Sequence, residues 1–470
     1  MNKVFEKENE IIEGFHSIGQ EQIFRFWKEL TRCEREHLLG SISKISPSEC
    51  QLAWNDMQID QIQISNPQEP KATTATNPLC SSLLKFREQG EELLRLGKVA
   101  AFTVAGGQGT RLGHSGPKGT YPCTPISNIS LFEKFAQNIR FFAKRYEQFP
   151  WWFIMTSQEN HDETIDFFKK NNFYGLEKER VKFFQQGEMP VFDLNGKIIL
   201  KKKYQVLTSP NGHGGSFGAI SDSGALKIME NEGIEIISYF QVDNPLVYCL
   251  DPAFIGLHQM EKSEMSSKAV EKVNADEKVG TFLKLDDKLH VVEYSDIPKD
   301  MSIKQKEDGK LCYRLGSIAI HLINRTFIKS LTDEKESKNK RLKYHGAFKP
   351  VDHIDENGNH VIGKSPNALK AETFVFDALP LAQNPLVLEV NRGEEFAPIK
   401  NAQGIDSIES SQKLQVLRAK KWLKKTGYSV KSEKSEILSS FAPTWPHFME
   451  HISNPSELTQ FFSSQDIQFD

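Results

Sequence analysis

A glycine-rich loop at residues 104–119 constrains this chain more than any other feature. The loop reads V-A-G-G-Q-G-T-R-L-G-H-S-G-P-K-G and continues the apolar run Val99–Val104. Glycines let a backbone adopt positive φ and approach a ligand closely, and successive N–H groups then form a concave anion site. Arg111 and Lys118 add two positive side chains that can offset the charge of a polyphosphate. The pattern predicts a buried strand followed by a loop that binds a nucleoside triphosphate.

Two common phosphate-binding motifs do not fit this loop. The Walker motif requires Ser or Thr after its lysine, whereas Lys118 is followed by Gly119. The dinucleotide fingerprint requires G-x-G-x-x-G, whereas Gly107, Gly109 and Gly113 form G-x-G-x-x-x-G. A strand-to-helix connection that is glycine-rich but binds nothing is the alternative, and the two cations inside the loop argue against it.

Length and composition limit the class of protein. A chain of 470 residues is expected to form two or three domains. The formal net charge of −3 gives no reason to expect a nucleic-acid or membrane partner. The six cysteines are scattered without a C-x-x-C motif, which is typical of reduced thiols. The first residues are too charged for a secretory signal, so we expect a cytoplasmic protein.

Apolar runs and helical patterns alternate after residue 97. We expect a helical N-terminal domain over 1–97, an α/β domain over 98–404 and a small C-terminal subdomain over 405–470. Such alternation predicts an α/β fold with a mixed sheet flanked by helices, and ligands bind such sheets at the carboxyl ends of the strands.

Individual elements can be placed from the same patterns. The polar segment Gln58–Thr76 reads as a connection over the surface. Residues 20–45 are expected to form two helices, and further helices are expected at 81–97, 130–146, 160–171, 216–231, 252–262 and 408–425. Strands are expected at Val99–Val104, Trp152–Met155, Val181–Phe184, Ile236–Val242, Thr281–Leu283, Val291–Tyr294, Ser317–Leu322 and Leu386–Val390.

The sequence indicates a functional role for three further residues to different degrees. Asp243 follows an apolar strand and is well placed for Mg²⁺, the alternative being a helix-capping aspartate. His213 lies in the glycine cluster S-P-N-G-H-G-G-S and can bond a ligand or simply form a turn. Lys400, taken alone, reads as a surface lysine. No constellation for covalent catalysis is present, whereas nucleotidyl transfer depends on positioning and charge neutralisation alone.

Four further motifs follow the first loop along the chain: F-F-Q-Q-G-E-M-P at 183–190, V-D-N-P-L-V at 242–247, K-A-E-T-F-V-F-D at 370–377 and E-F-A-P-I-K-N-A at 395–402. Together with the first loop they resemble the eukaryotic-type UDP-sugar pyrophosphorylases. They occur in the family's order and are most similar to the UDP-N-acetylhexosamine (UDP-N-acetylglucosamine) pyrophosphorylase branch. The resemblance implies a Rossmann-like nucleotidyltransferase core with a mixed, mostly parallel sheet, within the domain predicted at 98–404.

The resemblance also implies a role for individual residues. The nucleotide would contact the first loop and several later positions: Ala105, Gly106, Gly107, Lys118, Gln186, Gly212, His213 and Lys370. Gln186 matches the position that reads uracil, and Lys370 matches a phosphate-binding lysine. The sugar would contact Glu293, Ser317, Phe374 and Phe376. The catalytic cations would be Arg111, Lys118 and Lys400, and Asp243 would bind Mg²⁺.

The implied reaction joins UTP and a sugar 1-phosphate into a UDP-sugar and pyrophosphate. N-acetylglucosamine 1-phosphate is the expected sugar substrate, and the protein is expected to be a monomer or a weak homo-oligomer. Two departures leave other sugars open. His213 stands where this branch usually has Asn, and Ser317 stands where it has the Asn that contacts the acetamido group. Glucose 1-phosphate or a broad range of sugars is one alternative, and an inactive UDP-sugar-binding regulator is another.

Overall fold

The computed structural model describes residues 2–43, 45–59, 64–75, 81–333, 340–427 and 433–452. The chain forms two compact units, each assembled from separate stretches of sequence. Unit 1 comprises Met1–Ile64, Gln186–Gly218 and Arg341–Asp377. Unit 2 comprises Ser65–Gln185, Ala219–Lys340 and Ala378–Asp470.

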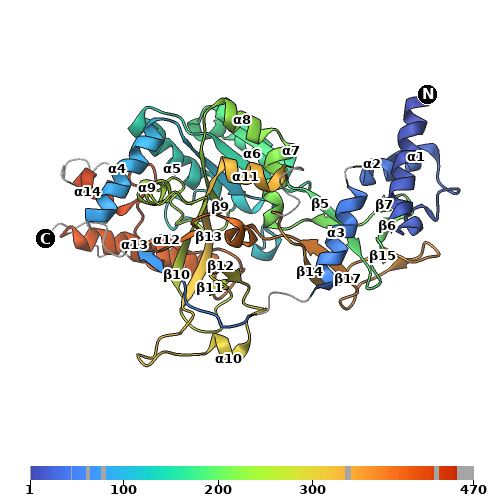
Figure 1. Cartoon of the computed structure of the whole chain (residues 1–470). Coiled ribbons are helices and arrows are strands. Elements are labelled where there is room, and N and C mark those ends of the chain that lie inside the picture. The colour runs from blue at the N-terminus through green and yellow to red at the C-terminus, as the bar shows by residue number, and fades with distance from the viewer. Residues whose placement is uncertain are drawn as a thin grey trace. The chain divides into compact units, whose positions relative to one another are not determined.

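A mixed sheet of ten strands forms the centre of unit 2 (Figure 1). On its main path β13 alone, among the described strands, runs antiparallel to both neighbours, and the others are parallel. In spatial order this path is β1 (Ala72–Thr74), β18 (Leu386–Glu389), β10 (Met265–Glu271), β13 (Leu315–Asn324), β9 (Ile236–Gln241), β2 (Val99–Val104), β3 (Trp152–Thr156) and β4 (Val181–Gln185). Strands β11 (Thr281–Leu285) and β12 (Lys288–Val292) form a hairpin beside β13. The predicted α/β class and mostly parallel sheet are confirmed.

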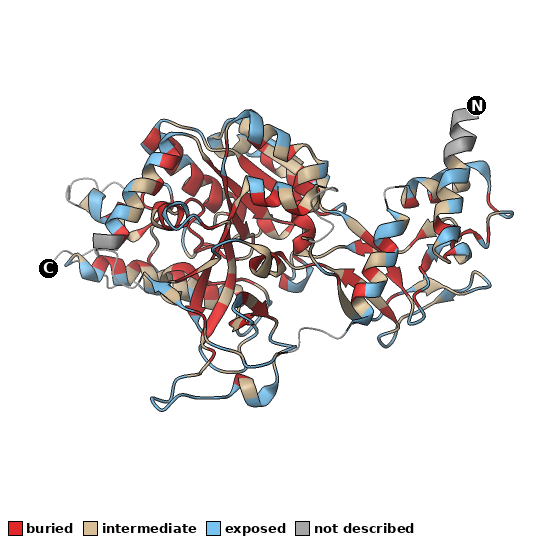
Figure 2. Ribbon diagram, viewed as in Figure 1, coloured by how far each residue is buried: buried red, intermediate tan, exposed pale blue. Residues whose placement is uncertain are grey.

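Most strands of the sheet are buried because they are largely apolar, although β10 also buries Ser266, Ser267 and Lys268. Figure 2 shows buried residues concentrated in these strands and on the helix faces that cover them. The described helices of unit 2 are α4 (Ser81–Arg95), α5 (Leu131–Tyr146), α6 (His161–Lys170), α8 (Ala225–Asn231), α9 (Pro252–Met260), α10 (Lys299–Ser302), α11 (Arg325–Thr332), α12 (Arg392–Glu395), α13 (Ile408–Lys425) and α14 (Trp445–Ile452). Helix α7 (Ser216–Asp222) crosses the boundary of the two units. No described helix combines the length and the apolar character needed to cross a bilayer.

Helices α4 and α9 approach each other at a pair of glycines. A Cβ added to Gly90 would lie 1.8 Å from the carbonyl oxygen of Pro252, and one added to Gly256 would lie 1.7 Å from that of Phe86. These distances are far below van der Waals contact, so any larger residue at either position would force the helices apart.

Unit 1 is built on a smaller antiparallel sheet. Its spatial order is β14 (His345–Lys349), β17 (Ala368–Glu372), β5 (Glu188–Phe192) and β8 (Thr208–Pro210). Two short ribbons form separate two-stranded sheets in the same unit, β6 (Leu200–Lys202) with β7 (Gln205–Val206) and β15 (His353–Ile354) with β16 (His360–Val361). The helices are α1 (Asn2–Ser17), α2 (Arg32–Ile42) and α3 (Pro47–Gln58).

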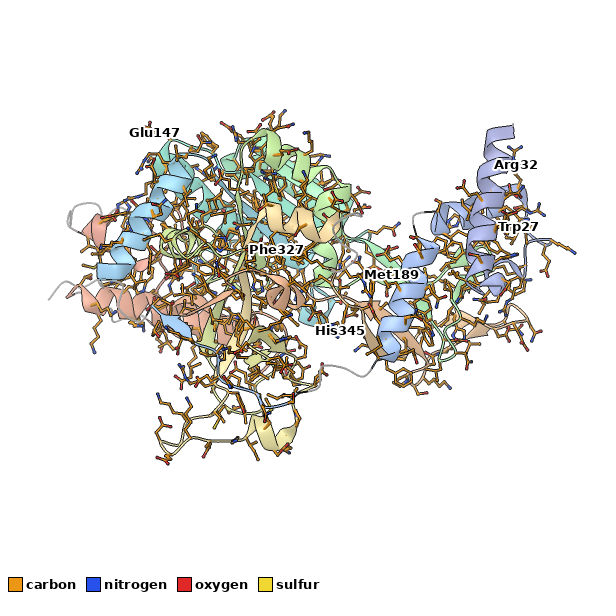
Figure 3. All side chains as sticks on the ribbon, in the orientation of Figure 1. Trp27, Arg32, Glu147, Met189, Phe327 and His345 are labelled. Carbon is orange, nitrogen blue, oxygen red and sulfur yellow. The ribbon has the colours of Figure 1, made fainter. Side chains whose placement is uncertain are left out.

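The core of unit 1 joins the N-terminal helices to strands from the middle of the chain. Ile23, Leu38 and Ala53 pack in one cluster with Met189, which Figure 3 labels, and Phe192. An ion pair at 2.5 Å links Asp56 of α3 to Arg341. The N-terminal helices therefore need partners far along the chain to complete their core.

The units differ from the consecutive domains expected at 1–97, 98–404 and 405–470. Strand pairing explains the difference, because β17 pairs with β5 and so joins residues near 370 to residues near 190. Helix α4 instead packs on α9 within unit 2. The last residues, 453–470, lie outside the described part of the chain, as does Cys80.

Several predicted elements are corrected by the structure. Residues 72–74 form strand β1 on the sheet edge, although Gln58–Thr76 read as a surface connection. The helix expected over 216–231 is broken at Gly224, whose φ of 75° belongs to the left-handed region. The strand expected at Val291–Tyr294 ends earlier, at Val292. Within 20–45, the first expected helix is only a short 3-10 turn, Glu21–Phe24.

Candidate active site

The glycine loop after β2 folds back on itself and leaves backbone donors open. The N–H of Gly109 donates to the carbonyl of Gly116 at 2.8 Å, and that of Lys118 donates to Gly107 at 3.0 Å. The N–H groups of Gly106 and Gly107 have no acceptor among the described residues. Unpaired N–H groups in a tight loop are the feature by which backbone binds phosphate oxygens.

A buried asparagine holds the start of this loop in place. The Nδ2 group of Asn160 donates to the carbonyl oxygens of Ala105 at 3.0 Å and Gly107 at 3.3 Å. Its Oδ1 accepts from the backbone N–H of Ser157 at 2.9 Å. Both carbonyls are thereby turned toward the protein interior. Sequence reasoning missed Asn160, because only its contacts distinguish it from a polar residue before a helix.

The two cations of the loop remain available to a ligand. Arg111 is exposed and Lys118 is half-buried, with its Cε 3.9 Å from where a Cβ on Gly107 would lie. Neither forms an ion pair with a described carboxylate. Gly119 is required for packing, because a Cβ there would lie 2.2 Å from the ring of Phe132.

Asp243 and Lys400 lie together at the same edge of the sheet. Strands β2 and β9 are parallel with Val104 opposite Gln241, so the glycine loop and Asp243 follow neighbouring strand ends. The backbone N–H of Ile399 donates to the carbonyl of Asp243 at 2.8 Å. This contact brings Ile399, and with it the neighbouring Lys400, next to Asp243. The sequence spacing of Lys400 did not indicate this proximity.

Asp406 is a carboxylate that sequence reasoning missed. Its backbone carbonyl accepts from the N–H groups of Lys400 at 2.7 Å and Asn401 at 3.0 Å. Burial raises the pKa of its carboxyl, the Lys400 ammonium lowers that pKa, and the Asp243 carboxylate raises it. Its charge is therefore coupled to both residues. In the sequence it reads only as the residue before Ser407, the N-cap of α13.

The donor chemistry of this edge fits Mg²⁺. Asp243 and Asp406 offer hard oxygen ligands, and Mg²⁺ in nucleotide sites is held by one or two carboxylates together with phosphate oxygens and water. In the described ranges, no group of three or more His, Cys, Asp or Glu side chains could hold a metal by itself. A nucleotide would therefore have to supply part of the coordination.

Glu293 and Ser317, the predicted sugar ligands of unit 2, meet around Gly280. The N–H of Ser317 donates to the carbonyl of Gly280 at 2.7 Å, and a Glu293 carboxylate oxygen lies 3.6 Å from where a Cβ on Gly280 would be. Ser317 is opposite Ala269 on β10, just before a bulge in β13 where Ala319 has a φ of 54°. Both side chains thus lie near the edge that carries Asp243.

Gln186 and Gly212 are in direct contact in unit 1. The Nε2 of Gln186 donates to the carbonyl of Gly212 at 2.6 Å, which fixes the orientation of the amide. Gly212 has a φ of 79°, and a Cβ there would lie 2.3 Å from the carbonyl oxygen of Thr373. A glycine is therefore required at this position on both counts.

His213 belongs to an aromatic stack with both predicted sugar-pocket phenylalanines. Its ring centroid lies 5.3 Å from Phe374 and 5.5 Å from Phe376, and His345, labelled in Figure 3, stacks on Phe374 at 4.6 Å. The Nδ1 of His213 accepts from the N–H of Val375 at 3.1 Å, so a neutral ring carries its proton on Nε2. Loss of hydration, with a smaller effect of His345, lowers the pKa of His213 to about 4.

Lys370 lies on the central strand β17 of the same unit. It is opposite Ala347 on one side and Val191 on the other, and it is half-buried. Burial raises the pKa of the Glu372 carboxyl, and the nearby charge of Lys370 is among those that lower it.

The predicted site residues thus fall into two sets, one in each unit. Unit 1 holds the groups expected to contact uracil and part of the sugar, namely Gln186, Gly212, His213, Lys370, Phe374 and Phe376. Unit 2 holds the expected phosphate, metal and remaining sugar ligands, namely Ala105, Gly106, Gly107, Arg111, Lys118, Asp243, Glu293, Ser317 and Lys400.

Comparison with known proteins finds a family model and several relatives that match most of this chain. Residues 50–446 match the family model described as UTP–glucose-1-phosphate uridylyltransferase. The chain is 35% identical to human UDP-N-acetylhexosamine pyrophosphorylase-like protein 1 over 412 residues, covering 83% of this chain and 79% of that protein. It is 33% identical to the UDP-N-acetylglucosamine pyrophosphorylase of Saccharomyces cerevisiae, covering 89% and 91% of the two chains.

Solved structures agree as well. The crystal structure of a putative UDP-N-acetylglucosamine pyrophosphorylase from Entamoeba histolytica superposes with a TM-score of 0.72 at 31% identity, covering 82% of this chain and 96% of that chain. The uridine diphosphate N-acetylglucosamine pyrophosphorylase of Trypanosoma brucei shares the fold, with a TM-score of 0.83 at 23% identity over 98% of this chain and 97% of that one.

Proposed function

Because this chain belongs to the UTP–glucose-1-phosphate uridylyltransferase family, we propose that it makes a UDP-sugar and pyrophosphate from UTP and N-acetylglucosamine 1-phosphate. Membership rests on the family match over residues 50–446 and makes the chain a nucleotidyltransferase. The choice of sugar is supported by the names of the human and yeast relatives, which specify N-acetylhexosamine and N-acetylglucosamine.

The proposed reaction needs neither a covalent intermediate nor a general base. A phosphate oxygen of the sugar 1-phosphate, already anionic, attacks the α-phosphorus of UTP, and pyrophosphate leaves in line with the attack. The task of the protein is therefore to position the two substrates and to stabilise the negative charge on the transferring group.

The unit 2 residues are suited to this charge stabilisation. The strongest support is the contact between Ile399 and Asp243, because it puts Lys400 beside the proposed metal ligand at the edge where the glycine loop begins. We assign Lys400 to the α-phosphate, and Arg111 and Lys118 to the other phosphates. Asp243, with Asp406 as a second oxygen donor, would hold Mg²⁺, which supplies positive charge to the phosphates when bound.

The unit 1 residues are suited to recognising a base. We assign Gln186 to the uracil edge, since its amide carries both a donor and an acceptor and its orientation is fixed by Gly212. Gly212 would lie against the base, and Lys370 would contact a phosphate. A cytoplasmic location and a monomeric or weakly oligomeric state stay predictions from the sequence.

Pyrophosphate release is the test of this proposal. The full chain is assayed with UTP, Mg²⁺ and a panel of sugar 1-phosphates, and we expect the highest kcat/KM with N-acetylglucosamine 1-phosphate. Binding of UDP-sugar without release from any sugar would favour the regulatory alternative. Equal turnover with ATP or GTP would contradict the assignment of Gln186.

Glucose 1-phosphate is the second candidate substrate, and one observation favours it. Ser317 stands at the position expected to contact an acetamido group, and its hydroxyl is shorter than the amide of Asn. Higher kcat/KM with glucose 1-phosphate in the same panel would select this alternative.

A further inference from the structure

A lysine in unit 2 is completely buried and takes no part in the proposed chemistry. Lys268, on β10, is 0% exposed, and its Nζ lies 2.5 Å from carboxylate oxygens of both Asp251 and Glu395. The rings of Tyr248 and Phe254 flank the ammonium, each with its centroid at 5.2 Å. Burying a charge costs free energy even when it is paired, so such a group is expected to fix a geometry.

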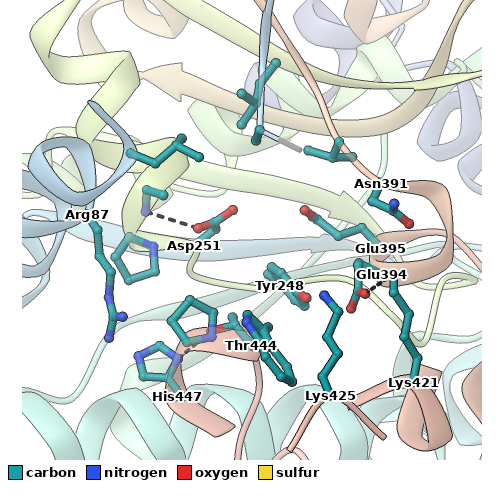
Figure 4. Close-up of a pocket in the computed structure, with 18 residues that line it drawn as sticks. Arg87, Tyr248, Asp251, Asn391, Glu394, Glu395, Lys421, Lys425, Thr444 and His447 are labelled. Atoms are coloured by element: carbon teal, nitrogen blue, oxygen red, sulfur yellow. Dashed lines mark hydrogen bonds and ion pairs between the residues drawn. The ribbon is translucent and has the colours of Figure 1, made fainter. Parts of the chain in front are cut away.

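The two carboxylates lie at helices α9 and α12, and both form ion pairs with Lys268. Figure 4 shows Asp251 and Glu395 facing one another at a cavity of about 140 Å³ in unit 2. Asp251 caps α9 by accepting from the N–H of Ala253 at 3.1 Å. Glu395 is the last residue of the short helix α12. Lys268 therefore anchors the segment that follows β18 to the interior of the unit.

Asn244 anchors the same segment from the other side. It is 3% exposed, and its Nδ2 donates to the backbone carbonyl of Glu395 at 2.7 Å. Its Oδ1 accepts from the N–H groups of Ala397 at 3.1 Å and Leu246 at 3.2 Å. A side-chain amide is needed here, because the site uses one donor and one acceptor from the same group.

The anchored segment comprises residues 395–400 and ends at Lys400. The Ser411 hydroxyl donates to the carbonyl of Ala397 at 2.6 Å, and the N–H of Ile399 donates to the carbonyl of Asp243. The segment is thus bonded to the two consecutive residues Asp243 and Asn244, one through its backbone and the other through its side chain.

We propose that Asn244 and Lys268 are positioning residues that fix Lys400 relative to Asp243. This inference rests on the proposed function, because it assigns the two residues a role in transfer at the α-phosphorus. Asn244 acts by holding the segment against the end of β9, and Lys268 acts through Glu395. Neither residue contacts the substrates in this role.

A double-mutant cycle on the full-length chain tests the inference. We expect Asn244→Ala to lower kcat for pyrophosphate release by about 10- to 100-fold with KM for UTP changed less than about 3-fold, since misplacement of a catalytic group reduces turnover by this order. Glu395→Gln, which keeps the volume of the side chain, is expected to lower kcat by about 3- to 10-fold. In a Lys400→Ala background both substitutions should change kcat by less than about 2-fold, because the group that they position is absent.

Asn391→Ala is the matched control. Asn391 lies in the same connection and caps α12 through the N–H of Gly393 at 3.0 Å, but it has no contact with Asp243 or Asn244. We expect it to lower the melting temperature and leave kcat unchanged. If Asn244→Ala and Glu395→Gln each lowered kcat equally with and without Lys400, the two residues would have a general structural role. That result would overturn this inference but not the proposed function. A wild-type chain that releases no pyrophosphate would overturn the proposed function and this inference together.

Discussion

The two units present different chemistry with different kinds of support. In unit 2 the candidate groups are mostly charged or are open backbone N–H groups, and the glycine loop and Asp243 follow the ends of the buried strands β2 and β9. In unit 1 they are mostly neutral, and contacts between side chains hold them, as in the stack of His213 with Phe374 and Phe376.

The difference matches what the ligands proposed for each unit would require. Phosphates are bound by charge, which acts over several ångströms and needs cations that no protein carboxylate has already neutralised. A base or a sugar ring is bound by shape and by donors and acceptors at fixed positions, which require rigid neighbours. Substitutions of the proposed phosphate and metal ligands of unit 2 should therefore act mainly on turnover, and those of the proposed base and sugar ligands mainly on stability and selectivity.

Removal of the Lys400 ammonium is expected to have the largest effect. Lys400→Ala should lower kcat for pyrophosphate release by about 10²- to 10³-fold, the usual loss when one preorganised electrostatic group is removed. Lys424→Ala, at an exposed lysine of α13, is the control and should leave kcat unchanged. If thermal melting showed that Lys400→Ala does not fold, the residue would be needed for stability. The proposed difference between turnover effects and stability effects would then be contradicted.

A pair of glycines tests the role of shape in unit 1. Gly212 and Gly224 have φ of 79° and 75°, but only Gly212 has protein atoms where a Cβ would lie. We expect Gly212→Ala to destabilise the protein by about 2–4 kcal/mol, from backbone strain and overlap together. Gly224→Ala should lose only about 1 kcal/mol from strain. Chemical denaturation measures both, and equal losses would contradict the close contact with Thr373.

The His213 ring makes stability depend on pH, because loss of hydration lowers its pKa in the folded chain. Well above pH 6.5 the ring is neutral whether the chain is folded or not, so it has no effect on the pH dependence there. As the pH falls from 6.5 toward the folded pKa of about 4, the unfolded chain takes up a proton that the folded chain does not. Folding therefore loses up to about 3 kcal/mol over this range.

The variant His213→Asn should lose less stability between pH 6.5 and 4 than wild type. His360→Asn, at an exposed histidine of unit 1, should follow wild type. Denaturation midpoints at several pH values measure this. If the free energy of unfolding of His213→Asn depended on pH as that of wild type does, the His213 ring of the wild-type protein would have to be hydrated.

The smallest expected effect concerns sugar preference. Ser317→Asn adds an amide beside Glu293 and Gly280, and it should shift the ratio of kcat/KM toward N-acetylglucosamine 1-phosphate over glucose 1-phosphate by about 3- to 10-fold, the value of one hydrogen bond. Ser295→Asn, in the exposed loop after β12, is the control. An unchanged ratio would remove Ser317 from the sugar site.

The sequence was most informative where local pattern and burial agree. The strand Val99–Val104 and the helix at 408–425 were predicted with their observed bounds. The strand is a continuous apolar run that the fold buries, whereas the helix buries Ser411, Gln415 and Ala419 and leaves the side chain of Leu417 exposed. The mixed sheet followed from the alternation of such elements.

The pairing of strands that are far apart in the sequence could not be predicted from local sequence patterns. Nothing in the residues around 190 and 370 indicated that β5 and β17 are neighbours, so the composition of unit 1 could not be predicted. Asn160, Asp406 and Asn244 have the same limitation, since each is distinguished only by partners far along the chain. Their roles and those of the other site residues stay predictions that the experiments above address.

The reversed direction of β13 has a consequence for how this protein can diversify. Its neighbours on the sheet deliver their last residues to the edge that carries Asp243, whereas β13 delivers its first. The segment between β12 and β13, which includes α10 and is largely exposed, therefore enters the sheet close to Ser317. Insertions and deletions in that segment can therefore change the proposed sugar 1-phosphate site during evolution and leave the proposed UTP-binding residues on the parallel strands intact.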